Sequence, residues 1–268
     1  MTLKNHIEDC YPLSNVNSLM VYDDGEARVF MLTVETKKYI AKLGPTANIE
    51  NLLRHNAYIS EMSPHGLHIL NTMEGRECAQ CGPGRMIVVY EYIEGYTLEE
   101  LVTSYACSHR LASATGKALA LFHRELNGIR NGRIQASGGI VGLIHGDFNL
   151  ANLICTDTAT HDLRFIDFDN TRVDGFEVDL FEMLIDLYVV AAKDEYAKVL
   201  ACAFVEGYNH HASVKLPTKA TLLQSGEHYE KAQFTYHHNR AKMLGTNSWE
   251  ERFFAKYPVL CNLINEII

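Results

Sequence analysis

Hydrophobic and polar positions divide the sequence into a strand-rich first part and a largely helical remainder. Short apolar runs predict a meander of three strands and a later hairpin of two, over residues 18–22, 28–36, 38–43, 67–73 and 86–93. Asp-Asp-Gly-Glu at 23–26 separates the first two runs and is typical of a hairpin turn. Apolar residues at helical spacing predict a helix over 49–62, which Pro64 and Gly66 would end.

The pattern changes after Glu94 and Gly95, where helical periodicity begins. Helices are predicted from Leu98 onward and over residues 111–126, 178–192, 196–208 and 249–268. Short strands are predicted between them, at residues 143–145, 153–155 and 163–167. We therefore expect an α+β protein with a small antiparallel sheet and one helix in an N-terminal domain, 1–91, followed by a larger, mainly helical domain, 92–268.

Composition and charge narrow the class of partner. The chain has 268 residues, 47% of them hydrophobic, and a formal net charge of −9. An acidic surface of this kind binds nucleic acid and anionic lipid poorly, because both are recognised through Lys and Arg. The apolar stretch at 180–192 contains Glu182 and Asp186, which predicts a packed helix rather than a membrane span. We expect neither nucleic acid nor a membrane as partner.

The cysteines indicate a reducing compartment. Seven of them are scattered along the chain, which is an odd number and does not resemble a disulfide framework. Cys78 and Cys81 have the spacing of a metal or redox pair, but no second such pair accompanies them, and a Gly-flanked hairpin turn is the simpler interpretation. We expect a cytoplasmic protein.

Candidate chemistry is concentrated at 143–169, LIHGDFNLANLICTDTATHDLRFIDFD, where two apolar strands each end in acids and amides. A carboxylate at the end of a buried strand is costly unless a partner compensates its charge, so these acids are expected to have a role. Asn152 and Asp167 offer the oxygen ligands that Mg²⁺ prefers. Asp147, on the same loop as Asn152, could orient a hydroxyl group and accept its proton. These are the components of phosphoryl transfer.

The motif HGDFNLANLI resembles the catalytic loop of the aminoglycoside phosphotransferase and choline kinase family, whose fold is protein-kinase-like. FIDFD resembles the family's metal-binding strand end, YIAKL its phosphate-binding strand, MIVVYEYIEG its interlobe hinge, and ALALFH the helix beneath the catalytic loop. FVEGY resembles a late helix that is common in the family. These segments stand in the family's order and span roughly residues 20–210.

The resemblance implies a two-lobed protein-kinase-like fold and an ATP- and Mg²⁺-dependent kinase of a small-molecule hydroxyl. Asp147 would be the catalytic aspartate, and Asn152 and Asp167 would hold Mg²⁺. His145 would be structural. The nucleotide would be contacted by Gly25, Lys42, Glu50, Glu91 and Ile93, with Lys42 on its phosphates and the backbone of Glu91 and Ile93 on adenine.

Several positions leave alternatives open. Lys42 could be a solvated strand-end lysine. Its acidic partner is either Glu50 or Glu61, and Glu50 is favoured because it shares a helix face with the expected position. Asp169 could contact a second metal or face solvent. Seven acids at 174–195 could attract a cationic acceptor or form the solvated face of a helix.

Two other functions remain to be distinguished. An atypical Ser/Thr protein kinase is disfavoured, because Gly146 stands where protein kinases carry Arg and no Ala-Pro-Glu segment is present. The glycine run of a protein-kinase nucleotide loop is reduced to Gly25. A nucleotide-binding pseudokinase is disfavoured by the retained Lys42, Asp147, Asn152 and Asp167.

Overall fold

The computed structural model describes residues 2–23, 27–62, 66–128, 134–136, 139–212 and 219–267. The chain forms two compact units. Unit 1 contains Met1–Glu94 together with Asp167–Asn170, and unit 2 contains Gly95–Ile166 and Thr171–Ile268. The segment 167–170 thus lies between two stretches of unit 2 along the sequence but packs within unit 1.

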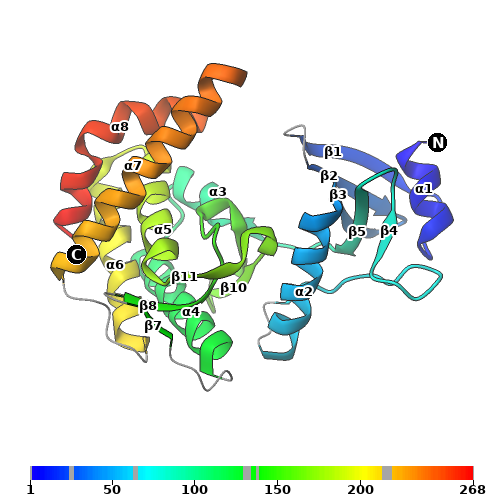
Figure 1. Ribbon diagram of the computed structural model, residues 1–268, viewed down its shortest axis with the longest axis horizontal. Coiled ribbons are helices and arrows are strands. Elements are labelled where there is room, and N and C mark those ends of the chain that lie inside the picture. Colours follow the sequence, from blue (N-terminus) through cyan, green and yellow to red (C-terminus); the bar gives the residue numbers. More distant parts are fainter. Residues whose placement is uncertain are drawn as a thin grey trace. The chain divides into compact units, whose positions relative to one another are not determined.

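Unit 1 is built on a five-stranded antiparallel sheet with the strand order β1-β2-β3-β5-β4 (Figure 1). Its strands are β1 (Asn17–Asp23), β2 (Arg28–Val34), β3 (Lys37–Pro45), β4 (Cys78–Gln80) and β5 (Arg85–Glu91). The helices are α1 (Leu3–Cys10), α2 (Thr46–Met62) and the short 3₁₀ turn η2 (Phe168–Asn170). The three predicted N-terminal strands and the helix after them are confirmed.

Two features of unit 1 differ from the sequence-based expectation. The strand predicted at 67–73 is wrong, because this segment contributes only an isolated bridge from Ile69 to Tyr90, and Cys78–Gln80 pairs with β5 instead. The pair Cys78 and Cys81 accordingly lies at the β4–β5 turn. Helix α1 was not expected; the Thr2 side chain caps it by accepting the N–H of Asn5.

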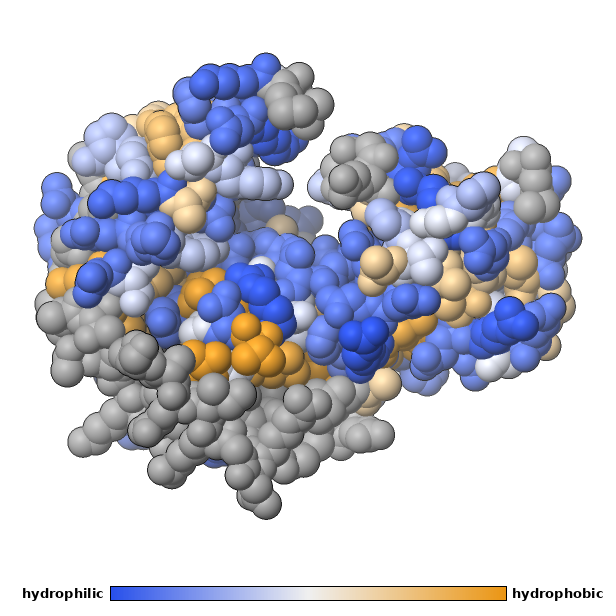
Figure 2. Space-filling view, in the orientation of Figure 1, coloured by the Kyte–Doolittle hydropathy of each residue, from blue (hydrophilic) through white to orange (hydrophobic). Residues whose placement is uncertain are grey.

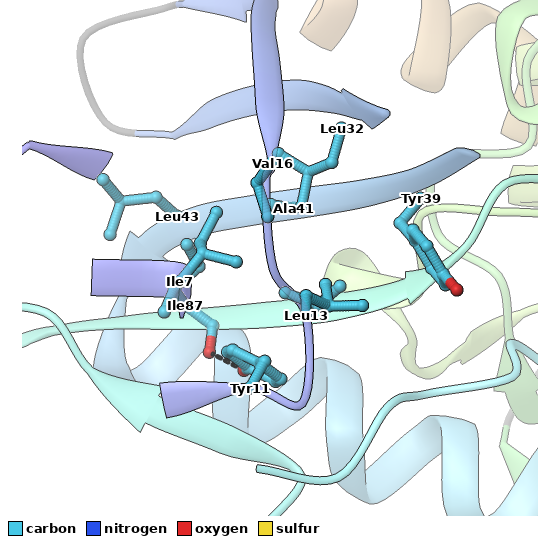
Figure 3. Packing of buried hydrophobic residues seen from close by; sticks show 10 residues of the cluster. Ile7, Tyr11, Leu13, Val16, Leu32, Tyr39, Ala41, Leu43 and Ile87 are labelled. Atoms are coloured by element: carbon cyan, nitrogen blue, oxygen red, sulfur yellow. Dashed lines mark hydrogen bonds between the residues drawn. The ribbon is translucent and has the colours of Figure 1, made fainter. Parts of the chain in front are cut away.

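One buried apolar core of unit 1 lies on a single face of the sheet. Its buried apolar side chains come from α1, the chain after it and three strands, namely Ile7, Tyr11, Leu13, Val16, Leu32, Tyr39, Ala41, Leu43, Ile87 and Val89 (Figure 3). The Tyr11 hydroxyl donates to the carbonyl of Ile87 at 2.9 Å and so ties the end of α1 to the sheet. Because successive side chains of a strand point to opposite faces, Lys42 points away from this core.

Unit 2 is mainly helical. Its helices are α3 (Leu98–Thr103), α4 (His109–Gly128), α5 (Glu177–Val190), α6 (Asp194–His211), α7 (Lys219–Leu244) and α8 (Ser248–Asn265). Its strands form two small antiparallel sheets, β10-β9-β6 and β11-β8-β7. Their bounds are β6 (Tyr96–Thr97), β7 (Ile134–Ala136), β8 (Gly139–Ile144), β9 (Leu153–Asp157), β10 (Asp162–Phe165) and β11 (Arg172–Gly175).

Helix α7 and strands β6, β7 and β11 were not expected, whereas the other helices of unit 2 are confirmed. Strand β10 ends at Phe165 rather than Asp167, because Asp167 has a φ of +63°, which a strand cannot accommodate. Hydrophilic residues predominate on the face of each unit drawn in Figure 2. Among the described residues, no helix has an apolar stretch long enough to cross a membrane.

Candidate active site

The loop 145–149 leaves strand β8 in unit 2 and leads through the 3₁₀ turn η1 (Leu150–Asn152) into β9. Strand β8 pairs with β7 and β11 on its two sides, and β9 pairs with β10 and β6. Both ends of the loop are therefore attached to sheets. Gly146 has a φ of +80°, a conformation that favours glycine at this turn.

The carboxylate of Asp147 is held by two neighbouring amides. Asn149 Nδ2 donates to Asp147 Oδ1 at 2.9 Å, and Asn152 Nδ2 donates to Asp147 Oδ2 at 3.0 Å and to the Asp147 carbonyl at 2.9 Å. Asn149 Oδ1 in turn accepts the N–H groups of Ala151 and Asn152, which caps η1. Neutral donors orient the carboxylate without cancelling its charge, so it can still accept a proton from a hydroxyl group.

Three carboxylates of α5 accept backbone N–H groups along this loop. The two oxygens of Asp179 accept from His145 at 2.9 Å and Gly146 at 2.8 Å. Glu182 and Asp186 accept from Phe148 at 3.1 Å and from Leu150 at 2.8 Å.

The spacing of these acids places them on one face of α5, three and four residues apart. Asp179 and Asp186 are buried, so neither belongs to a solvated face, and that expectation is wrong for these two acids. The attraction of a cationic acceptor to the acids at 174–195 stays a prediction.

The environments of the α5 acids differ in their effect on protonation. Burial alone would raise the pKa of Asp179, but the hydrogen bond and charge of His123, the charge of His145 and the N–H of Gly146 hold it below its ordinary value. Burial, together with the neighbouring Asp147 and Asp179, raises the pKa of Glu182 well above its ordinary value. Burial also raises the pKa of Asp186 to about 6, although two donors oppose this.

His145 is fully buried and joins the loop to the end of β10. Its Nε2 lies 2.9 Å from the carbonyl oxygen of Ile166, and the Ile166 N–H donates to the Asn152 carbonyl at 3.0 Å. Phe122, Phe148 and Phe165 surround the imidazole ring. This packing fits a structural side chain.

In unit 1, Lys42 on β3 is buried and lies between two carboxylates. Its Nζ is 2.5 Å from Asp167 Oδ1 and 2.7 Å from Asp169 Oδ2. Asn51 on α2 donates to the carbonyl of Asp169 at 2.6 Å and so fixes the 167–170 segment. Lys42 is therefore no solvated strand-end lysine, and Asp169, whose side chain is 13% exposed, does not face solvent.

The charges of Lys42, Asp167 and Asp169 do not balance. Burial opposes the charged form of Lys42, but Asp167 and Asp169 raise its pKa above the ordinary value. Burial and the charge of Asp167 raise the pKa of Asp169 to about 6, against the effect of Lys42. Asp169 Oδ1 is buried and has no hydrogen-bond partner among the described residues. Two carboxylates and one ammonium leave negative charge that a cation could balance.

The predicted partner Glu50 does not pair with Lys42. Glu50 is exposed and, within the described residues, makes no ion pair with Lys42. The predicted Lys42–Glu50 pair is wrong, because the 167–170 segment supplies the carboxylates instead. Gly25 and the side chain of Glu61 lie outside the described part of the chain.

Glu91 and Ile93 stand at the end of β5 and just beyond it. The Glu91 side chain is exposed and lies 3.1 Å from His68 Nδ1. The Glu91 N–H donates to the His68 carbonyl at 3.0 Å, so this N–H is not available to a nucleotide. Ile93 is partly buried.

Sequence reasoning missed Asn149, Glu182 and Asp186. For Glu182 and Asp186 the available signal was the spacing of acids on an otherwise apolar helix, because a charged residue that recurs on the buried side of a helix needs a partner.

Across the described residues, no cluster of three or more His, Cys, Asp and Glu side chains could hold a metal ion.

The sequence matches no protein-family model and no curated protein. Among solved structures, spectinomycin phosphotransferase APH(9)-Ia with ADP and spectinomycin aligns at a TM-score of 0.70 and 13% identity, over 99% of this chain and 98% of that one. An aminoglycoside phosphotransferase from Alicyclobacillus acidocaldarius aligns at 0.65 and 12%, over 100% and 94%.

A thermostable mutant of APH(4)-Ia with AMP-PNP and hygromycin B aligns at a TM-score of 0.55 and 12% identity, over 96% of this chain and 98% of that one. The matches cover nearly the whole of each chain. The chain therefore has the protein-kinase-like fold of the aminoglycoside phosphotransferases, and the fold class predicted from the sequence is confirmed.

Proposed function

We propose that the chain is an ATP-dependent phosphotransferase that moves the γ-phosphoryl group to a hydroxyl of a small molecule. The acceptor is aminoglycoside-, amino alcohol- or sugar-like. The observation that carries this proposal is the Asp147 carboxylate, which two amide donors orient on a loop that α5 holds by its backbone. Solved structures of the same fold support it, since they include a phosphotransferase bound to ADP and spectinomycin and another bound to AMP-PNP and hygromycin B.

Asp147 orients the acceptor hydroxyl and takes its proton as the oxygen attacks phosphorus. The pair of amides from Asn149 and Asn152 fixes both carboxylate oxygens, which reduces the reorganisation needed to reach the reacting geometry. In-line phosphoryl transfer depends mostly on such positioning and on neutralising the charge of the phosphate oxygens.

Asn152 and Asp167 are proposed to hold Mg²⁺, and their chemistry fits the ion. The hydrogen bonds that Asn152 makes to Asp147 use its amide nitrogen, which leaves an amide oxygen as a ligand of the type Mg²⁺ prefers. Asp167 brings a carboxylate, and the buried Asp169 Oδ1 beside it lacks a partner among the described residues. When bound, Mg²⁺ would neutralise charge on the phosphate oxygens.

Lys42 is proposed to bind the α- and β-phosphates, with Gly25 in the loop over them. The Glu91 carbonyl and the Ile93 backbone are proposed to contact adenine. Lys42 supports this role because its ammonium is held in the charged form. Glu50 is left out of the proposed site because it is exposed and does not pair with Lys42.

The test is release of ADP by the purified protein with Mg·ATP across pooled acceptors. The pools contain aminoglycosides, choline and ethanolamine, sugars, hydroxy amino acids, and a protein extract. Asp147→Ala is the blank, and Asp157→Ala, in the exposed β9–β10 turn, is the matched control. We expect one small-molecule pool to stimulate the wild type and Asp157→Ala, and Asp147→Ala to stay silent while still binding ATP.

Other outcomes would replace the proposal. Stimulation by the protein extract alone would indicate a protein kinase. Silence in every pool, while Mg·ATP still raises the melting temperature, would indicate a pseudokinase. Wild-type turnover by Asp147→Ala would remove the catalytic assignment.

A further inference from the structure

Among the described side chains, the carboxylate of Asp186 on α5 links helix α8 to the candidate catalytic loop. Trp249 Nε1 donates to Asp186 Oδ1 at 2.6 Å, and the Leu150 N–H donates to Asp186 Oδ2 at 2.8 Å. Asp186 is 6% exposed, so water competes little for either bond. One buried side chain thus joins the first turn of α8 to the first residue of η1.

The indole is held firmly enough to act as a fixed donor. Asn247 and Glu250 form a capping box at the start of α8, with distances of 2.8 and 3.1 Å. The Trp249 ring stacks on Phe253 at a centroid distance of 5.0 Å and an angle of 19°. His237 of α7 lies on the same ring at 4.7 Å.

Glu250 extends this support to α7. Its fully buried carboxylate accepts from His237 Nδ1 at 3.1 Å and from Arg240 Nη1 at 2.8 Å. The position of Trp249 is therefore set by the packing of α7 against α8.

A second tie between α5 and α8 does not involve the loop. Lys256 Nζ donates to the carbonyls of Tyr188 and Ala191 and pairs with Asp194 at 3.1 Å. These carbonyls lie at the C-terminal end of α5, where a lysine is a favourable cap. Lys256 therefore offers a control that loosens the same helix pair without touching Asp186.

We propose that Asp186 and Trp249 are positioning residues for phosphotransfer, which makes the C-terminal helix part of the catalytic apparatus. The inference rests on the function proposed above. Leu150 opens η1 and Asn152 closes it, and Asn152 donates to Asp147. A shift of Leu150 is therefore passed to Asp147 within one turn of backbone.

Asp186 forms a bridge of two hydrogen bonds, one from Trp249 and one from Leu150, and the chemistry of this bridge explains why both Asp186 and Trp249 matter. Without the indole N–H, Asp186 Oδ1 would be buried without that donor, and a buried unsatisfied carboxylate oxygen is strongly unfavourable. The carboxylate would then turn toward water and weaken its bond to Leu150. Small displacements of a reacting group lower the rate of catalysis far more than they lower substrate affinity.

The test compares backbone hydrogen exchange in the 145–153 segment of the full chain between the wild type and two variants. Trp249→Phe keeps the aromatic ring and removes the donor, whereas Lys256→Gln removes the second tie. We expect exchange in this segment to be about tenfold faster in Trp249→Phe, equivalent to about 1.4 kcal/mol of lost protection, and unchanged in Lys256→Gln. This readout does not require the acceptor to be known.

The kinetic arm uses ADP release. We expect Trp249→Phe to lower kcat about tenfold with KM for ATP nearly unchanged. Asp186→Asn should lower kcat as well, and the double variant should lose no more than Asp186→Asn alone, because both act through one bridge.

Unchanged exchange in Trp249→Phe, or equal acceleration in Lys256→Gln, would overturn the inference even if the wild type is active. Additive losses in the double variant would also overturn it. A wild type that releases no ADP in any pool, but whose loop exchanges faster in Trp249→Phe, would contradict the proposed function and leave the bridge standing as a structural link.

Discussion

Asp179 Oδ2 accepts the backbone N–H of His145 at 2.9 Å, although the two residues are 34 positions apart in the sequence. The same carboxylate accepts from Gly146 through its other oxygen, and His123 Nε2 lies 2.9 Å from Oδ2. Asp179 is fully buried. The start of the candidate catalytic loop thus depends on one carboxylate that water does not reach.

Asp179→Ala should lower the free energy of unfolding by about 3–5 kcal/mol, because it removes the acceptor of two backbone N–H groups and of the buried His123 ring. Denaturant unfolding followed by circular dichroism measures the change. Asp174→Ala is the control, since Asp174 pairs with Arg172 at the surface and should cost less than about 1 kcal/mol. Equal losses in the two variants would contradict the role given to Asp179.

Asp186 should make stability depend on pH between about 4 and 6. Its pKa is raised to about 6 in the folded protein from an ordinary value of 3.8. The folded state therefore takes up a proton at higher pH than the unfolded chain, and stability rises as pH falls through 6.

Relative to Asp186→Asn, the wild type should gain about 3 kcal/mol of unfolding free energy between pH 7 and pH 3.5. Urea titrations of both proteins across this range measure the difference. The variant serves as the control for every other titrating group. Parallel pH profiles of the two proteins would show that Asp186 does not titrate in this way.

Asp167→Ala should weaken Mg²⁺-dependent binding of ATP by about tenfold or more, because a carboxylate ligand is lost. Titration of a fluorescent ATP analogue with and without Mg²⁺ separates the metal-dependent part of the affinity. Asp162→Ala, in the exposed β9–β10 hairpin, is the control and should bind as the wild type does. If Asp167→Ala keeps the full Mg²⁺ effect, the metal is held elsewhere.

Gly116→Ala should destabilise the packing of α4 on α6 by about 1–3 kcal/mol, as overpacking does. A Cβ at Gly116 would lie 2.0 Å from the Phe204 carbonyl oxygen, which belongs to the backbone of α6 and cannot move aside cheaply. Thermal unfolding measures the loss.

The matched control is Gly44→Ala, where an added Cβ would meet only the Ile49 side chain at 3.7 Å. It should melt close to the wild type. A Gly116→Ala protein that melts as high as Gly44→Ala would show that the two helices can separate without loss.

Much of the fold followed from local pattern. Alternating and helical periodicities predicted β1 to β3, α2 and most helices of unit 2, because these elements bury one face of their own sequence. These periodicities failed where pairing with a distant strand decided which segment became a strand. Residues 67–73 have the composition of a strand, yet β5 pairs with Cys78–Gln80. Helix α7 was missed because its apolar positions follow no clear helical face.

The sequence alone pointed to a contact between Asp147 and Asn152 because they lie within five residues of each other, and Asn152 Nδ2 does donate to Asp147 Oδ2. The catalytic role of the loop stays a prediction. The partners of Lys42 could not be predicted from short spacing. Its partners Asp167 and Asp169 lie about 125 residues later in the chain. Helix position favoured Glu50, which the structure leaves exposed.

By itself the sequence predicted the change from a strand-rich first part to a helical remainder and the loop with Asp147 and Asn152, since these depend on periodicity and short covalent spacing. Only the tertiary structure decided that Asp179, Glu182 and Asp186 turn inward to the loop, that Lys42 lies between two aspartates, and that Trp249 reaches Asp186. The physical reason is that burial and pairing of a charge depend on which distant segment packs against it, and local periodicity carries no record of that segment.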